Sequence, residues 1–129
     1  MNTYRKTGTP TKLLSMTHIW SFRSGDAMPD LPDNGKWMIF ESADTVDRIW
    51  RVIKQATEQG KLGIAAKVSS KGLADRSRTK KYLICVYTEN YHDKEEITRV
   101  KSVLQALGVD TLHSYKTSQK YATFRIDES

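Results

Sequence analysis

The sequence predicts an α+β domain in which a curved, largely antiparallel sheet carries two main helices on one face. Three observations support this fold class: six short segments with strand character, two segments with apolar residues at helical spacing, and their order along the chain. The order is β-β-α-β-β-α-β-β, which lacks the regular alternation that a doubly wound parallel sheet requires. With 129 residues, the chain is long enough for one domain with a modest core.

The six strand-like segments are short, rich in β-branched and aromatic residues, and separated by turn-forming residues or helices. They are residues 17–23, 36–42, 62–68, 81–87, 112–116 and 121–126. The third and fourth segments are apolar enough to lie centrally in a sheet.

Two helices are expected between these strands. In the first, Asp44 is the expected N-cap, Gly60 marks the end, and the apolar stripe consists of Val46, Ile49, Trp50, Ile53 and Ala56. The second begins with a capping-box-like pair, Asp93 and Glu96. Gly108 ends this second helix, whose apolar face consists of Ile97, Val100, Val103, Leu104 and Leu107.

Residues 1–14 are polar and contain Gly8 and Pro10, which predicts a flexible arm that precedes a single domain at 15–129. This N-terminus lacks the apolar middle of a signal peptide, and no apolar run approaches the roughly 18 residues that span a bilayer. The single cysteine, Cys85, cannot form an internal disulfide and is expected to be a buried structural thiol. We therefore expect a cytoplasmic protein without a membrane partner; the sequence does not indicate its oligomeric state.

Positive charge is concentrated in one stretch of the chain. The net charge is +6, and residues 67–81 contain six cations and one acid, a net of +5. Such a balance favours phosphorylated ligands, nucleic acids or acidic surfaces. We expect this stretch to form a flexible cationic loop between two strands that can receive phosphate, although basic loops can also be ordinary solvated surface.

A phosphate site needs donors from several elements, because one exposed ion pair is worth only about 0–1 kcal/mol. Lys67 ends an apolar strand, where its amine either extends into solvent or reaches a site at the sheet edge. The other candidate ligand-binding cations are Arg76, Arg78, Lys80, Lys116, Lys120 and Arg125. Arginine offers a planar fork for bidentate phosphate contacts, whereas lysine acts as a point charge.

Trp37 directly follows a turn at the mouth of a strand, where its ring could stack on a planar ligand or pack into the core. Trp20 and Trp50 are expected in the core. His18 and His113 lie in expected strands, where either could face a cleft as an acid–base group. The histidines show no metal-ligand spacing, so we expect neither a metal nor a cofactor.

Several motifs together resemble one family. They are GKWMIF, DTVDRIW, AAKVSS, YLICVYT, YHDKEEITRV and KYATFRI, and over about residues 17–126 they are similar to the basophilic-leukaemia-expressed protein family. The resemblance implies a fold like that of the cap-binding translation initiation factor, with helices on the convex face of the sheet and a ligand cleft on the other. By that analogy Trp37 lies near one of the two tryptophans that hold the methylated base, but no tryptophan follows Trp50 to supply the second.

A weaker resemblance is to bacterial phosphothreonine lyases, in AAKVSS, the downstream arginines and KYATFR. It implies that Lys67 is the base that removes the α-proton and that Arg78 holds the phosphate. His18 or His113 would then protonate the leaving phosphate. Such a lysine needs a lowered pKa, which burial and neighbouring cations would provide.

Three functions stay open on the sequence. The first is recognition of a phosphorylated ligand, such as a nucleotide, an RNA end or a phosphopeptide, by the cationic loop at a sheet cleft. The second is a phosphothreonine-lyase-like enzyme with Lys67 as base. The third is a non-catalytic protein-interaction module whose basic surface docks an acidic partner.

Overall fold

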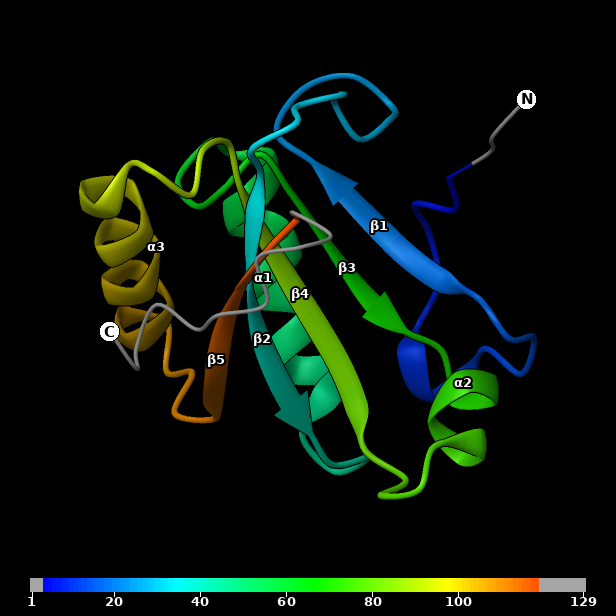
Figure 1. Cartoon of the computed structure of the whole chain (residues 1–129). Coiled ribbons are helices and arrows are strands. Elements are labelled where there is room, and N and C mark those ends of the chain that lie inside the picture. Colours follow the sequence, from blue (N-terminus) through cyan, green and yellow to red (C-terminus); the bar gives the residue numbers. More distant parts are fainter. Residues whose placement is uncertain (1–3, 119–129) are drawn as a thin grey trace.

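A computed structural model describes residues 4–118 as a five-stranded antiparallel sheet with helices packed against one face (Figure 1). The strands are β1 His18–Phe22, β2 Gly35–Glu41, β3 Ala65–Ser69, β4 Tyr82–Thr88 and β5 Leu112–Thr117. Their order across the sheet is β1-β3-β4-β2-β5. The α+β fold class is confirmed, as are five of the six expected strands, with shifted ends. The sixth, at 121–126, falls outside the described residues.

Both expected helices are present, as α1 Val46–Glu58 and α3 Lys94–Ala106. The Asp93 carboxylate caps α3 by accepting a hydrogen bond from the Glu96 N–H at 3.2 Å, as the sequence predicts. The N-cap of α1 is Thr45 and not Asp44, and its hydroxyl donates to the carboxylate of Glu41 at the end of β2. No helix within residues 4–118 has the length and apolar character needed to cross a membrane.

The cationic stretch at 67–81 differs from the prediction, because a helix follows the end of β3 where a flexible loop was expected. Residues Lys71–Arg76 form α2, which packs through the buried Ala74. Ser70 is its N-cap, and the Ser70 hydroxyl oxygen accepts a hydrogen bond from the Leu73 N–H at 3.2 Å. This helix is not evident from the sequence pattern, because six residues are too few for an apolar stripe.

The main core lies between the sheet and the two long helices. Alternate strand residues face the helices, as the pleat of a β-strand requires. The principal contributors include Ile39, Ile84, Val86 and Val68 from the sheet, with Ile49, Trp50, Ile53, Ile97, Val100 and Leu104 from the helices. Trp50 is thus a core residue, as expected.

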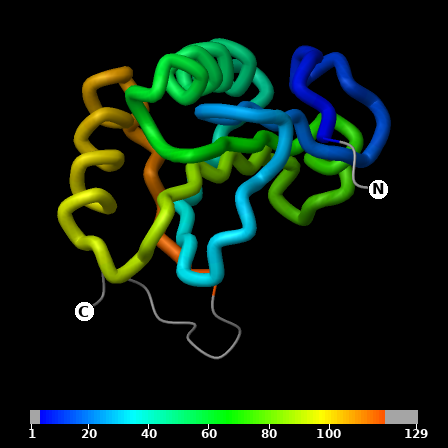
Figure 2. Tube along the Cα trace, turned by 90° about the horizontal axis from the view of Figure 1, so that it is seen from above, coloured from blue at the N-terminus to red at the C-terminus, as the bar shows by residue number. Residues whose placement is uncertain are grey.

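We call the opposite face of the sheet the open face. It carries a smaller buried cluster of Phe22, Ile64, Ala65, Cys85 and Tyr87, against which Tyr4, Trp20, Met28, Leu31 and Leu83 pack. Figure 2 shows α1 on one side of the sheet and the connection between β1 and β2 projecting on the other. Cys85 is fully buried, in agreement with the expectation of a structural thiol.

Several of residues 4–14 contact the sheet or lie in ordered local structure. The Tyr4 ring lies 5.0 Å from the ring of Trp20, and the Trp20 N–H donates to the Arg5 carbonyl at 2.7 Å. A single 3-10 turn follows at Pro10–Lys12, and Pro10 is buried. Residues 4–14 therefore pack against the domain.

We predict that Ser70→Ala lowers the free energy of unfolding by about 2–3 kcal/mol, because the fully buried Ser70 hydroxyl serves three backbone groups. It accepts from the N–H groups of Leu73 and Thr17 and donates to the Ser15 carbonyl. Ser77→Ala is the matched control, because the Ser77 hydroxyl donates only to the Ala74 carbonyl. Urea denaturation measures both changes, and equal losses would contradict this role for Ser70.

Candidate functional site

The register of the five strands decides which side chains share the open face. Residues paired across antiparallel strands project to the same side of the sheet. The open-face positions are His18, Trp20, Phe22, Ala65, Lys67, Ser69, Leu83, Cys85, Tyr87, Lys36, Met38, Phe40, Ser114 and Lys116. None of these strand positions holds a carboxylate, although three of them hold lysines.

The three lysines, which we call the open-face lysines, come from three different strands. Lys36 of β2 is paired directly with Lys116 of β5, so two like charges stand side by side. Lys67 of β3 is paired with Cys85 of β4, which lies between Lys67 and β2. Such pairs of like charge are destabilising in a sheet. Within the described residues no ion pair involves any of the three, so nothing there neutralises their charge.

The charges of the open-face lysines affect the pKa values of the same neighbouring side chains. Burial raises the pKa of the Cys85 thiol, while the charges of Lys36, Lys67 and Lys116 partly oppose that rise. Burial also lowers the pKa of Lys67; the Cys85 thiol opposes this effect and the charge of Lys36 adds to it. The open-face lysines therefore surround the middle of the sheet.

His18 lies near the same charges. Burial lowers the pKa of His18 to about 4, and the charges of Lys67 and Lys36 contribute to that decrease. The imidazole is therefore neutral near pH 7 and can accept or donate a hydrogen bond without adding to the positive charge. Of the two histidines that the sequence proposes as acid–base groups, the structure brings His18 to Lys67.

Aromatic rings accompany the open-face lysines. The Lys67 Nζ lies 5.2 Å from the centre of the Trp20 ring, and the Lys36 Nζ lies 5.9 Å from the centre of the Tyr87 ring. The two rings are nearly parallel, with centres 5.9 Å apart. A hollow of about 90 Å³ adjoins Tyr87 and is lined by Asn34, Gly35, Lys36, Tyr87, Lys116, Thr117 and Ser118. Trp20 is partly exposed on this face, whereas the sequence places it in the core.

Trp37 faces the helices and is only 5% exposed. Its indole N–H donates to the Ile97 carbonyl of α3 at 3.0 Å, and the Lys101 Nζ lies 5.7 Å from its ring. Its ring is thus not available for stacking on the open face. Trp37 is therefore a core residue in this structure, and the tryptophan on the open face of the sheet is Trp20.

The predicted loop cations lie apart from the open-face lysines Lys36 and Lys116. Arg76 ends α2, and Arg78 and Lys80 follow it in the connection to β4, at the opposite end of β4 from Tyr87. The Lys80 ammonium contacts the Asp75 carbonyl, and Lys80 adopts a positive φ of 61°. Lys120 and Arg125 fall outside the described residues.

His113 lies on β5, with β4 and β2 between its strand and that of Lys67. Its ring centre is 5.2 Å from that of Phe40, and its Nδ1 lies 3.0 Å from the Ser114 hydroxyl. The structure therefore separates His113 from the lysine that it was expected to assist.

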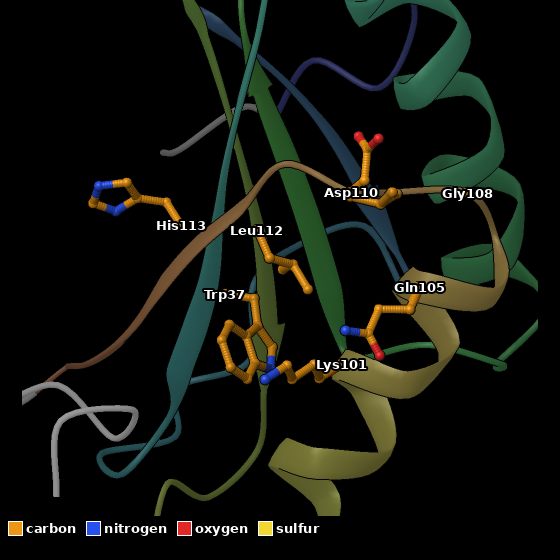
Figure 3. Close-up of a pocket in the computed structure, with 8 residues that line it drawn as sticks. Trp37, Lys101, Gln105, Gly108, Asp110, Leu112 and His113 are labelled. Carbon is orange, nitrogen blue, oxygen red and sulfur yellow. The ribbon is translucent and has the colours of Figure 1, made fainter.

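A cavity of about 650 Å³ lies on the other side of β5, where that strand meets α3 (Figure 3). Its lining includes Lys101 and Gln105 of α3, with Trp37 and Leu112. Figure 3 shows that the labelled His113 side chain points away from the other labelled side chains. Of the predicted site residues, Trp37 and His113 contribute to the lining of this cavity, whereas Lys67, His18 and the described candidate phosphate-binding cations do not.

Lys36 is a candidate site residue that the sequence did not single out. It alternates with Met38 and Phe40 along β2, a pattern that places the three on one face. Lys36 is of interest because it is paired with Lys116. The alternation of residues along β2 does not reveal this pairing, because the two strands are distant in the sequence.

Comparison with known proteins supports the expected fold. The structure is similar to that of Ascaris suum eIF4E-3, solved as a complex with m2,2,7G cap, with a TM-score of 0.52 and 17% sequence identity. The match covers 73% of this chain and 58% of that one, less than two thirds of its length. At this identity the likeness shows the fold alone. It does not support the expected resemblance to phosphothreonine lyases. A family model described as basophilic leukemia-expressed protein Bles03 matches residues 33–121, which is most of the chain. The chain belongs to the basophilic leukemia-expressed protein Bles03 family.

Proposed function

We propose that this protein binds a nucleotide through its phosphates on the open face of the sheet. The observation that carries the proposal is the set of open-face lysines, Lys36, Lys67 and Lys116, without a carboxylate among the open-face strand positions. The proposed anion site thus lies on the sheet itself, with Lys67 and Lys116 retained from the sequence analysis and Lys36 added. Arg76, Arg78 and Lys80 lie outside it.

Uncompensated positive charge favours an anion. The directly opposed Lys36 and Lys116 repel each other, and a phosphate between them would replace that repulsion with two attractions. Lys67 is partly buried, so its attraction for a phosphate is screened less than that of an exposed lysine. The neutral imidazole of His18 can add a hydrogen bond to a phosphate oxygen.

The adjacent rings favour a nucleotide over other phosphorylated ligands. Stacking of a base on an aromatic side chain contributes about 1–3 kcal/mol and suits every base. Trp20 offers a partly exposed ring beside Lys67, although Tyr4 already contacts one side of it edge-on. The likeness in fold to a protein that was solved with m2,2,7G cap supports a nucleotide ligand as well. Because Trp37 is buried, we do not include a pair of tryptophans around a methylated base.

We predict that Lys36→Ala, Lys67→Ala and Lys116→Ala each weaken the binding of guanosine diphosphate about tenfold, since each removes a charge-assisted contact. Isothermal titration calorimetry at low salt measures these affinities. Arg51→Ala is the matched control, because Arg51 is an exposed cation on α1. Trp20→Leu is expected to weaken the binding of guanosine diphosphate but not the binding of inorganic pyrophosphate, which has no base to stack. An unchanged affinity in all three lysine variants would exclude the proposed site.

The pH dependence of stability tests the environment of His18. As the pH falls below about 6.5, the unfolded chain binds a proton on His18, whereas the folded protein does so only near pH 4. This residue therefore lowers the stability of the native state progressively between those values. We predict that in His18→Asn the loss of stability between pH 7 and pH 5 is smaller by about 1–2 kcal/mol. Urea denaturation at both pH values measures this difference, and an identical loss in both proteins would contradict it.

A second candidate function is elimination of phosphate from phosphothreonine, which the lowered pKa of Lys67 and its proximity to His18 favour. The neutral Lys67 amine would take the α-proton while the Cβ–O bond breaks, which leaves a carbon–carbon double bond and releases phosphate. A bound phosphate would raise the pKa of His18 and allow it to protonate that leaving group.

If this second function is correct, a phosphothreonine peptide is converted to a product lighter by the mass of phosphoric acid. Mass spectrometry detects the product, and Lys67→Ala is expected to abolish it while the melting temperature stays near that of the parent. His113→Ala serves as the control, because two strands, β4 and β2, lie between the strand of His113 and that of Lys67. A peptide that remains intact with the parent protein would exclude the enzyme and leave the binding proposal in place.

A further inference from the structure

A different surface, formed by residues 12–16, α2 and residues 77–81, combines exposed apolar side chains with cations. Leu14 is 73% exposed and Met16 is 56% exposed, and they are the exposed large hydrophobic residues of the described part of the chain. They alternate along the segment, whereas the preceding Leu13 packs against the core. Two such side chains so close together in a short segment are unusual for a surface that contacts only water.

The segment that carries these side chains is fixed in place. The Ser70 hydroxyl donates to the Ser15 carbonyl at 2.6 Å, and the Gly72 N–H donates to the Leu13 carbonyl at 3.2 Å. A Cβ on Gly72 would lie 2.2 Å from the Leu14 carbonyl oxygen, so the segment rests directly on α2. The exposure of Leu14 and Met16 is therefore built into the backbone arrangement.

The cations of this surface are available for binding. Arg76 follows Gly72 by four residues and so lies on the helix face that meets the Leu14 segment. Within residues 4–118, Lys12, Arg76, Arg78 and Lys81 form no ion pair. Of the nearby acids, Asp75 is paired with Lys71 at 2.9 Å, and Asp47 accepts hydrogen bonds from Thr11. The result is a pair of apolar side chains beside several unneutralised cations.

We propose that this surface docks on an anionic lipid bilayer. The headgroup region of such a bilayer attracts cations, and the adjacent acyl boundary accepts aliphatic side chains, so one partner satisfies both features. A nucleic acid would bind the cations but would not provide an apolar environment for the side chains of Leu14 and Met16. The expectation of no membrane partner rested on the lack of a spanning segment, and surface docking does not require one.

Vesicle sedimentation with the full chain tests this proposal. We expect binding to phosphatidylcholine vesicles that contain about one third phosphatidylserine, and little binding to pure phosphatidylcholine. Arg76→Glu is expected to weaken binding about thirtyfold, whereas Arg51→Glu, with the same change in net charge on α1, should change it little. The double substitution Leu14→Ser with Met16→Ser leaves the charge unchanged and should weaken binding about tenfold or more.

Both serine substitutions are at exposed positions, so a thermal melt should match that of the parent. Binding that the two serine substitutions do not alter would overturn the proposal, because the surface would then act as a general polyanion site. An equal loss of vesicle binding in Arg76→Glu and Arg51→Glu would overturn the proposal as well. So would a lack of binding of the parent protein to either kind of vesicle. Lys36→Ala should leave vesicle binding unchanged, since Lys36 lies on the open face, so the nucleotide proposal is tested separately.

Discussion

The antiparallel register of β2 against β4 and β5 is the constraint on which the rest of the structure depends. Side chains alternate between the two faces of a strand, and a slip of one residue would exchange the faces. In the observed register Trp37 and Ile39 enter the core, and Lys36 projects to the open face. The Trp37 indole N–H bonded to the Ile97 carbonyl ties this register to the position of α3.

The open face is arranged at a cost to stability. Lys36 and Lys116 repel each other directly, and the ammonium of Lys67 and the imidazole of His18 are held where burial lowers their pKa values. A sheet surface optimised only for stability would have carboxylates at some of these positions. Groups with shifted pKa values beside uncompensated charge are a common feature of functional sites.

The cations of residues 67–81 are neighbours in the sequence but lie on two different surfaces of the structure. Lys67 belongs to the open face, whereas Arg76, Arg78 and Lys81 belong to the surface of α2 and the segment after it. The Ser70 hydroxyl joins the two regions, because it caps α2 directly after β3 and fixes the segment that carries Leu14. The protein therefore presents two cationic surfaces with different neighbours, aromatic on one and aliphatic on the other. A likeness of fold to Ascaris suum eIF4E-3 does not by itself distinguish them.

The sequence alone determined the fold class, α1, α3 and five strands, because apolar spacing and capping residues such as Asp93 act within a few residues of each other. It also singled out Lys67, Lys116 and His18 as candidates. Only the tertiary structure placed Lys36 beside Lys116, turned Trp37 towards α3, and left Trp20 on the open face. These outcomes depend on pairing between strands that are far apart in the chain, and local patterns carry no record of that register.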